Sequence, residues 1–421
     1  MSLRRVNCGS TCQQHLRLAS LRSSPVATSL FHNTAGKENQ IKGWKKLRFQ
    51  KSSGGCRVLA ASNGEPAAPE LAPGGVYEGQ VLGSEKYTTL QRFLMEEVQW
   101  VPEAEDSDLA ILLSDVASAT KRIADVLASA GIEGLMGKNE SVNMTGDKQQ
   151  KLDVVANDIL KDALASCGQV RSIASEEEDE VLLTDPNGRY AVVFDPLDGS
   201  RNIDAAIPTG TIFGVHVCQP VLEDTMDELE WALSDCLQPG DQLVAAGYAL
   251  YSSATMFVLT LGNGTHGFTL DRRTGDYVLT HRNITIPERG QIYSVNDARY
   301  HDWPRGLQRY IDAIRRGEGE SPKQYSARYI CSLVADFHRT LLYGGVAMNP
   351  RSHLRLVYEG NPLSMIAEQA SGVGSDGRRR ILSIKPDRLH QRLPLFLGSP
   401  KDIAELESYE DVQQEAKTYE V

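Results

Sequence analysis

The segment YAVVFDPLDGSRNID, residues 190–204, places three aspartates directly behind a run of apolar residues. An apolar run that ends in Pro, Asp and Gly is typical of a buried strand followed by a turn. We expect the strand to deliver Asp195 to its carboxyl end, and Pro196 to start a tight turn that brings Asp198 back toward it. Two carboxylates held that close repel each other unless a cation lies between them. The segment therefore predicts a cation site at the end of a buried strand.

Gly199 and Ser200 come next in the chain. We expect their backbone N–H groups to be exposed at the start of a helix or turn, where an anion can be held. A cation on one side and a phosphate on the other is the arrangement that phosphoryl transfer requires. The short segment thus predicts a phosphoryl-transfer site.

Acidic residues elsewhere in the chain can complete the cation site. Five of them lie at a strand end, in a glycine-containing loop or at a helix start: Glu176, Glu177, Glu359, Asp147 and Asp153. Oxygen ligands without His or Cys favour Mg²⁺ or Mn²⁺ over zinc. Any one such acid is more often a solvated surface charge. Their shared position beside the strand ends is what favours the cation site.

Apolar periodicity divides the chain into an N-terminal helical part, a run of strands and a mixed part. The spacing predicts helices over 90–98, 109–131, 152–168, 326–345 and 362–372. It predicts strands over 189–194, 210–217, 242–250, 256–261, 266–270, 276–280, 291–295 and 354–360. This order favours an α/β fold of layered sheets sandwiched by helices over a continuous βαβ winding.

The formal net charge of −11 is spread unevenly along the chain. Residues 1–64 carry 11 Lys/Arg and one acid, and they lack the apolar core of a secretory signal. This composition is typical of an organelle transit peptide, here ending near 58–62, and the alternative is a basic tail that stays attached. The acidic remainder argues against a nucleic-acid binder with a broad basic surface. No run of about 18 apolar residues exists to span a bilayer.

Cysteine usage argues against a disulfide scaffold. Three of the seven cysteines lie in residues 1–64, and the other four form neither a CxxC motif nor a Cys/His cluster. A structural zinc site is disfavoured on the same ground. Cys218 and Cys236 bracket an acidic loop and are the one pair that merits a redox hypothesis, although ordinary buried thiols are the favoured interpretation.

Several motifs occur together in a specific order: TGDKQQKLDV, DPLDGSRNID, LVAAGYALYSSAT, SARYICSLVADFHRTLLYGG, LRLVYEGNP and LHQRLPLFLGSP. Over about residues 85–410 they resemble the fructose-1,6-bisphosphatase family. The resemblance implies a layered α/β/α/β/α sugar-phosphatase fold and Mg²⁺-dependent hydrolysis of the 1-phosphate of fructose 1,6-bisphosphate to fructose 6-phosphate and phosphate. It divides the chain into a transit peptide and presequence, a linker, a metal and phosphate-site domain and a sugar-phosphate domain, over 1–64, 65–84, 85–280 and 281–421 respectively.

The presequence and the tail GSDGRRRILSIKPDRLHQRLPL resemble the chloroplast branch of the family. This implies the chloroplast stroma and a role in plastid carbohydrate metabolism, in the Calvin cycle, gluconeogenesis or starch biosynthesis. The partners expected are a small sugar bisphosphate and further copies of the chain, with neither nucleic acid nor membrane.

The resemblance assigns roles to individual residues by motif. The metal-binding groups are Glu176, Glu177, Asp195, the Leu197 carbonyl, Asp198 and Glu359. Asp153 and Glu177 match the pair that orients the attacking water, and Asp147 matches the acid of a loop that closes over the site. The substrate contacts are Gly199 and Ser200 at the 1-phosphate, and Asn296, Tyr329 and Arg355 at the sugar and 6-phosphate. Arg328 matches an arginine inserted into a neighbouring subunit's site, which implies a homotetramer.

Departures from the family pattern concentrate at the 6-phosphate. His353 replaces a lysine, Asn349 replaces a tyrosine, and the connecting loop is shortened to NPRSH. The pocket loses a permanent cation, for which His353 and Arg299 are partial substitutes. Arg201 stands where the family usually has serine, and it either contacts the 1-phosphate or lies at an interface.

Regulation is expected to differ as well. The turn that binds AMP in regulated members is here EDSDL, residues 105–109, whose acids repel a phosphate, and Val217 replaces an arginine of that site although Arg189 and Tyr190 remain. The cysteine-bearing insertion of the light-regulated form is shortened, so that only Cys236 remains of its closely spaced pair, with Trp231 near the other position. We therefore expect a chloroplast type without the full redox insertion, similar to isoform II, with neither AMP inhibition nor strong thioredoxin control.

Two alternative hypotheses stay open. The preferred substrate is sedoheptulose 1,7-bisphosphate in one, and the chain is a catalytically weakened binding or regulatory subunit in the other. The intact carboxylates favour an enzyme, because clustered like charges destabilise a protein that has no metal to hold.

Overall fold

The computed structural model describes residues 87–100, 107–142, 148–220 and 227–414. The chain separates into the units Met1–Pro69 and Glu70–Val421, and every described residue belongs to the second. The predicted presequence over 1–64, the linker over 65–84 and Asp147 all lie outside the described residues. No helix within the described ranges is both long and apolar enough to cross a membrane.

The first half of the described chain builds an eight-stranded sheet in the order β10-β9-β8-β7-β6-β5-β3-β4. Its strands are β3 Val170–Ser175, β4 Leu182–Leu183, β5 Tyr190–Asp198, β6 Thr209–Val217, β7 Leu243–Tyr251, β8 Thr255–Thr260, β9 Thr265–Asp271 and β10 Asp276–Ile284. Neighbours are antiparallel except for the parallel pair β3 and β5. Strands β5 to β8 are buried along almost their whole length, and burial on both faces explains their continuous apolar runs.

The second half builds a five-stranded sheet in the order β12-β11-β13-β15-β14. These strands are β11 Ile292–Ser294, β12 Ser326–Ala327, β13 Val346–Arg355, β14 Val373–Ser375 and β15 Arg392–Gly398. A separate ribbon pairs β1 Lys138–Val142 with β2 Lys148–Gln150. The seven predicted strands between 189 and 295 are all present.

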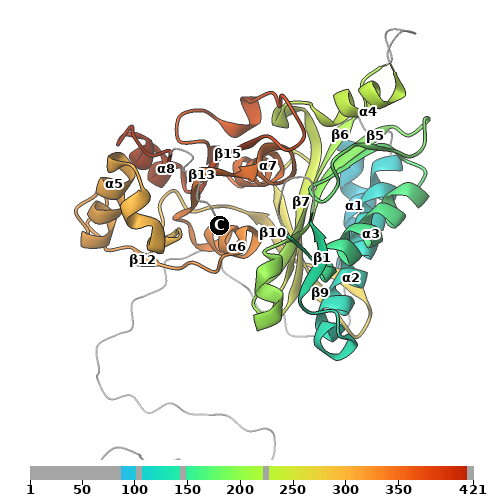
Figure 1. Cartoon of the computed structure of the whole chain (residues 1–421), viewed down its shortest axis with the longest axis horizontal. Coiled ribbons are helices and arrows are strands. Elements are labelled where there is room, and N and C mark those ends of the chain that lie inside the picture. The colour runs from blue at the N-terminus through green and yellow to red at the C-terminus, as the bar shows by residue number, and fades with distance from the viewer. Residues whose placement is uncertain (1–86, 101–106, 143–147, 221–226, 415–421) are drawn as a thin grey trace, which may run out of the picture. The chain divides into compact units, whose positions relative to one another are not determined.

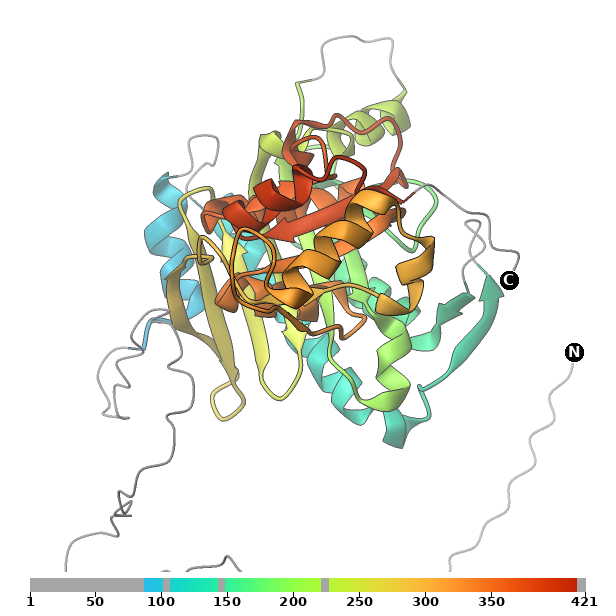
Figure 2. The same cartoon turned by 90° about the vertical axis from the view of Figure 1, so that its left-hand side faces the viewer.

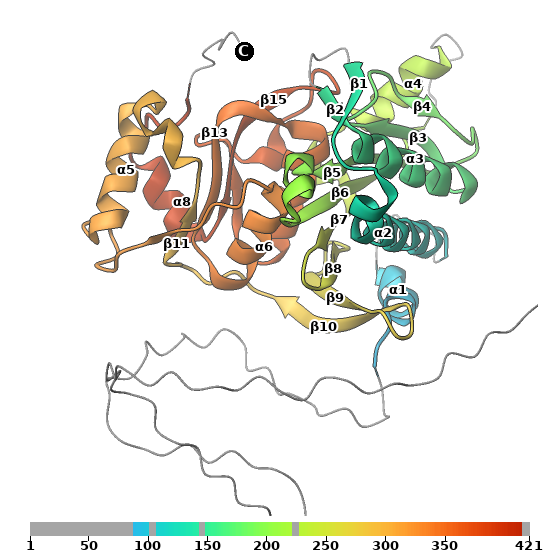
Figure 3. The ribbon, with the colours of Figure 1, turned by 60° about the horizontal axis from the view of Figure 1, so that its bottom comes forward.

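Helices alternate with the two sheets, as Figures 1 and 3 show. Helices α1 Leu90–Glu97, α2 Asp108–Glu133 and α3 Lys151–Ser166 lie on one side of the large sheet, and α6 Leu333–Tyr343 and α7 Asn361–Gln369 lie between the sheets. Helices α5 Arg305–Arg316 and α8 Pro400–Glu407 cover the far side of the small sheet and face the viewer in Figure 2. Helix α4 Glu228–Cys236 packs beside β3 and β5. The predicted α/β/α/β/α layering is confirmed.

Alternate residues of β5 pack into two different hydrophobic cores. Tyr190, Val192 and Phe194 pack against the helices of the first layer, whereas Ala191 and Val193 pack toward α4 on the other face. The strand repeat of two residues therefore holds two layers on one sheet.

Two predicted elements are wrong in part. The strand predicted over 354–360 ends at Arg355, and Leu356–Gly360 forms one π-helical turn, because a short, fully buried apolar run has no periodicity that separates strand from helix. The helix predicted over 326–345 shortens to α6, which starts after Ser332, whose hydroxyl accepts from the Ala335 N–H (3.3 Å).

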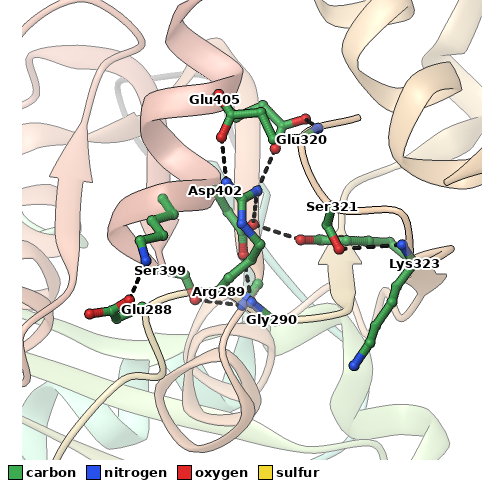
Figure 4. Close-up of polar contacts among 12 residues, drawn as sticks. Glu288, Arg289, Gly290, Glu320, Ser321, Lys323, Ser399, Asp402 and Glu405 are labelled. Atoms are coloured by element: carbon green, nitrogen blue, oxygen red, sulfur yellow. Dashed lines mark hydrogen bonds and ion pairs between the residues drawn. The ribbon is translucent and has the colours of Figure 1, made fainter. Parts of the chain in front are cut away.

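Helix α8 is anchored by an ion-pair network (Figure 4). Arg289 Nη1 pairs with Asp402 Oδ1 (3.1 Å) and with Glu405, and its Nη2 pairs with Glu320 Oε2 (2.6 Å). Tyr325 and the Gly290 N–H also donate to Asp402, at 2.7 and 2.8 Å. Asp402 is fully buried, so removing Arg289 would leave its charge without an ion-pair partner among the described residues.

Candidate active site

The acids of the opening segment lie within β5 itself. Asp195 pairs with Ile212 of β6 and Asp198 with Gly210, so β5 advances three residues while β6 advances two. This extra residue is a β-bulge. The predicted tight turn is therefore wrong: the chain stays in the sheet through Asp198, and Pro196 sits in the bulge, where its missing N–H is tolerated.

The bulge explains how the two aspartates converge. In a regular strand, residues three apart point to opposite faces. The additional residue of the bulge turns Asp198 to the same face of the sheet as Asp195. Two hydrogen bonds stabilise the bulge: the Thr211 hydroxyl donates to the Pro196 carbonyl (2.8 Å), and the Leu197 N–H donates to Asp195 Oδ1 (2.9 Å). Asp195 and Asp198 consequently face one point.

A third carboxylate comes from the π turn after β13. Carboxylate oxygens of Asp195, Asp198 and Glu359 all lie within 4.8 Å of one another. The three side chains are buried, with exposed fractions of 2%, 9% and 5%. The Glu359 carboxylate accepts from the Arg355 N–H, so the turn that the sequence predicted as strand is what aims this group.

Two further predicted acids border this cluster. Glu176 follows β3, whose parallel pairing with β5 puts both carboxyl ends at one sheet edge, and its carboxylate is paired with Arg355 Nη1. Asp153 sits in the first turn of α3, where Oδ2 accepts from the Gln150 N–H (2.8 Å) and Oδ1 is buried without a hydrogen-bond partner. Glu177 is half-buried, and its N–H donates to the Ser175 hydroxyl (3.2 Å).

Burial and mutual repulsion hold these acids partly protonated. Burial is the largest cause for each, and it raises the pKa of Asp198 to about 6, of Asp153 to about 7 and of Glu359 to about 8. For Asp195, burial and then the neighbouring charges of Glu176 and Glu359 raise the pKa well above its usual value. Full ionisation of the cluster at neutral pH is therefore unfavourable unless positive charge is supplied.

The donor set fits a hard divalent cation. Three buried carboxylates converge on one point, and neither His nor Cys contributes to the described cluster. The buried Asp153 Oδ1 also has no hydrogen-bond partner. Mg²⁺ and Mn²⁺ prefer such all-oxygen sites. The groups that would hold the ion are Asp195, Asp198 and Glu359, with Glu176 released from Arg355.

The predicted phosphate cradle adjoins the carboxylates. Gly199 has φ of 76°, and a Cβ there would lie 2.9 Å from the Ser332 Cβ, so only glycine fits. Ser200 begins the 3₁₀ turn Ser200–Ala205. Asn202 Nδ2 of this turn donates to the Ile330 carbonyl (3.3 Å), which ties the cradle to the segment before α6.

The other predicted substrate contacts lie on separate segments. The half-buried Asn296 side chain accepts from the Ala298 N–H (3.2 Å) and caps a 3₁₀ turn. Arg328 is exposed and Tyr329 is 46% exposed. Arg201 and His353 are also exposed, and the Arg355 guanidinium is paired with Glu176 beside the carboxylates.

Sequence reasoning missed Ser332 as a part of the site. Its hydroxyl and the Val334 N–H both donate to Asp198 Oδ2 at 2.8 Å, so the start of α6 orients this carboxylate. The signal was a serine directly before the apolar LVADF, a typical N-cap, but nothing in the sequence shows that α6 begins against β5.

A buried all-carboxylate cluster beside a glycine-defined anion cradle, at the bulged end of a strand in a layered α/β fold, defines a metal-dependent phosphatase. Comparisons with known proteins give the family. Residues 88–282 match the fructose-1-6-bisphosphatase N-terminal domain and residues 286–411 match its C-terminal domain. The chain belongs to the fructose-1,6-bisphosphatase family and is a phosphoric monoester hydrolase.

Individual relatives agree with this assignment. The chain is 43% identical over 419 residues to the chloroplastic fructose-1,6-bisphosphatase of Brassica napus, covering 95% of this chain and 98% of the relative. It is 43% identical over 333 residues to the class 1 fructose-1,6-bisphosphatase of Chlorobium phaeovibrioides, covering 77% and 98%. The crystal structure of Leishmania major fructose-1,6-bisphosphatase in holo form superposes with a TM-score of 0.72 at 38% identity, covering 78% of this chain and 100% of that one.

Mg²⁺ should stabilise this protein more as the pH rises. Without metal, the folded state binds protons on acids whose pKa values are about 6 to 8, whereas the unfolded chain has released them at its usual values of 3.8 and 4.5. Folded stability from these groups is therefore present at low pH and lost as pH rises through 6 to 8. A divalent cation replaces the protons, so the Mg²⁺-induced rise in Tm should be larger at about pH 8.5 than at about pH 5.5. Thermal scans with Mg²⁺ or chelator measure it, and an equal rise at both pH values would contradict it.

Proposed function

We propose that this chain is a plastid enzyme that uses Mg²⁺ to hydrolyse the 1-phosphate of fructose 1,6-bisphosphate, giving fructose 6-phosphate and phosphate. The observation that carries the proposal is the convergence of Asp195, Asp198 and Glu359 within 4.8 Å in a buried site, beside the Gly199 cradle. A chain under no demand for metal binding would gain stability by losing these charges.

The residues of the chain divide the chemistry between them. Gly199 and Ser200 hold the 1-phosphoryl group by their backbone N–H groups, and Asp153 and Glu177 accept the proton of the attacking water. The water oxygen bonds to phosphorus as the bond from phosphorus to the sugar oxygen breaks in line. When bound by the carboxylates, with Mn²⁺ a substitute for Mg²⁺, the metal polarises the phosphoryl group and neutralises the leaving oxygen. Asp147 closes its loop over the site, and Leu197 adds its carbonyl to the ligands.

Contacts at the distal end complete the proposed substrate site. Asn296, Tyr329 and Arg355 contact the sugar and its second phosphate, and His353 and Arg201 lie near the two phosphates. Arg328 reaches a neighbouring subunit's site in a homotetramer; its exposure supports this role, and its Nη1 donates to the adjacent Ala327 carbonyl (2.9 Å). The division into domains at 85–280 and 281–421 belongs to the same proposal.

Chloroplastic relatives and the basic first 64 residues support a location in the chloroplast stroma, with residues 1–64 as transit peptide. There the enzyme serves carbohydrate metabolism in the Calvin cycle, in gluconeogenesis or in starch biosynthesis. The proposal includes an isoform II-like type without the full redox insertion, and the shortened cysteine-bearing insertion supports it.

Phosphate release tests the function directly. Purified residues 65–421 should release phosphate from fructose 1,6-bisphosphate in the presence of Mg²⁺. Phosphate release should stop when a chelator removes the Mg²⁺. Faster release from sedoheptulose 1,7-bisphosphate would show that this ester, and not fructose 1,6-bisphosphate, is the preferred substrate. Release from neither ester, while Mg²⁺ still raises the Tm, would instead favour the weakened binding or regulatory subunit.

The rate should respond neither to AMP nor to dithiol reagents. Acids in EDSDL, residues 105–109, repel the AMP phosphate, and burial, followed by the Asp235 charge, raises the pKa of Cys218. Burial likewise raises the pKa of Cys236 well above its usual value, and a thiol that stays protonated exchanges slowly. Rates measured with AMP, with dithiothreitol and with an oxidant should agree within about two-fold. A several-fold change that Cys236→Ser removes would overturn the redox part.

A further inference from the structure

A short acidic turn follows β3 and is fixed at its backbone. It closes because the Glu178 N–H donates to the Ser175 carbonyl (3.3 Å). The Glu176 N–H donates to the Phe194 carbonyl of β5 (3.0 Å). The Glu177 N–H donates to the Ser175 hydroxyl (3.2 Å). Two acids of the proposed site are therefore held on a turn that is tied to β5.

Helix α3 presents three polar side chains at regular spacing. Asp153, Asn157 and Lys161 are four residues apart, so they follow one another along one face of the helix. Asn157 Nδ2 donates to Glu178 Oε1 (2.8 Å), and Lys161 Nζ is paired with the same oxygen at 2.5 Å. The helix face that carries Asp153 thus also binds the acidic turn.

Asn157 completes a chain of hydrogen bonds through this turn. The Ser175 hydroxyl accepts from the Glu177 N–H and donates to Asn157 Oδ1 (2.7 Å). The orientation of the amide is then determined, because a reversed amide would place Oδ1 against the Glu178 carboxylate. The one side chain therefore bonds both the start and the end of the turn.

Two side chains from the second half of the chain also hold the turn. His390 Nε2 lies 3.1 Å from the Glu178 carbonyl oxygen, and Arg355 is paired with Glu176. These two residues come from segments that do not carry Asp153. The position of the turn relative to Asp153 therefore depends on the bonds from α3.

Of the two side chains of α3 that bind the turn, Asn157 is the one shielded from water. The side chains of Lys161 and Glu178 are 26% and 42% exposed, so solvent screens their ion pair. Asn157 and Ser175 are 4% and 1% exposed, and bulk water does not compete for the bond between them. The amide is therefore the firmer connection between α3 and the turn.

We propose that Asn157 is a positioning residue for hydrolysis: it holds the turn after β3 against α3 and so fixes Glu177 relative to Asp153. This inference rests on the proposed function, in which these two acids accept the proton of the attacking water. Asn157 stands one helical turn from Asp153, so a shift of the acidic turn away from the amide changes the separation of the pair. A misplacement of about 1 Å at a reacting group can cost about 100-fold in rate.

An exchange between Asn157 and Glu178 tests this role. Asn157→Asp removes the donor and puts two carboxylates in contact, so kcat should fall by about 10- to 100-fold. The KM for fructose 1,6-bisphosphate should change by less than about three-fold, because the substrate contacts lie on other segments. Adding Glu178→Gln to this variant restores a donor and an acceptor in reversed order and should recover most of kcat.

The matched control is Asn263→Asp. Asn263 is exposed, and its Nδ2 donates to Glu97 Oε2 (3.1 Å), so the same substitution removes the same kind of bond at the surface. This variant should keep kcat. An Asn157 with a merely structural role would lower Tm without changing kcat of the folded chain. That result, or a loss of kcat that Glu178→Gln does not recover, would overturn the inference.

Ser175→Ala provides a second variant if Asn157→Asp does not fold. It removes the hydroxyl between the Glu177 N–H and the Asn157 amide, so kcat should again fall at nearly constant KM. Full kcat in Ser175→Ala would overturn the inference.

Calorimetric titration with Mg²⁺ provides a readout apart from turnover. Glu176 and Glu177 are proposed metal ligands, so Asn157→Asp should weaken Mg²⁺ binding several-fold and the exchanged pair should restore it. If Mg²⁺ affinity follows the exchange but even the unmodified chain releases no phosphate, the connection of the turn to α3 stands and the proposed function is overturned.

Discussion

Asp198→Asn should lower kcat/KM for Mg²⁺-dependent phosphate release by at least about 10³-fold, or ~4 kcal/mol of transition-state stabilisation. Asparagine keeps the size of the side chain, and its oxygen can still accept from the Ser332 hydroxyl and the Val334 N–H, so the fold should be retained. The charge needed to hold a divalent cation is lost. Phosphate-release kinetics over a Mg²⁺ series measure the effect.

Stability measurements separate this loss from unfolding. Without metal, Asp198→Asn should melt at the same or a higher temperature than the unmodified chain, because one of the mutually repelling acids is gone. Its Tm should no longer respond to Mg²⁺. Asp125→Asn, in an exposed ion pair on α2, is the matched control and should keep both properties. Substantial turnover by Asp198→Asn would remove this residue from the catalytic centre.

Arg289→Met should destabilise the protein by about 3–5 kcal/mol, the cost of leaving a buried charge without its partner. Asp402 is fully buried and Glu405 is 3% exposed, and Arg289 is the cation paired with both (Figure 4). Methionine fills a similar volume, so the loss reports the charge and not a cavity. The free energy of unfolding from denaturant titrations measures it.

An exposed ion pair provides the comparison for this prediction. Arg92 and Glu96 of α1 are separated by 2.8 Å but are 61% and 51% exposed, and Arg92→Met should cost less than about 1 kcal/mol. If Arg289→Met cost no more than Arg92→Met, the buried network would be an incidental contact and not the anchor of α8.

The candidate site divides into residues that the sequence identifies and geometry that it does not. The apolar run before Asp195 and the turn residues around it predicted a buried strand that ends in carboxylates, and the structure places both there. Glu359 was expected at a strand-to-helix junction, but the π turn that aims its carboxylate was predicted as strand. A fully buried run of five residues carries no periodicity that could distinguish the two.

Residue type, local spacing and the order of motifs were sufficient to predict the layered α/β class, which is confirmed, and a divalent-cation site with its acids, which stays a prediction. Those properties follow from burial and charge, which each residue carries with it. The tertiary structure alone decided that Asp195 and Asp198 share a face, because a bulge is defined only against the partner strand. It also decided that Ser332 orients Asp198 across 134 residues of chain. Contacts between segments so distant in sequence depend on how whole layers pack. The local sequence pattern of one segment does not indicate which other segment it will contact.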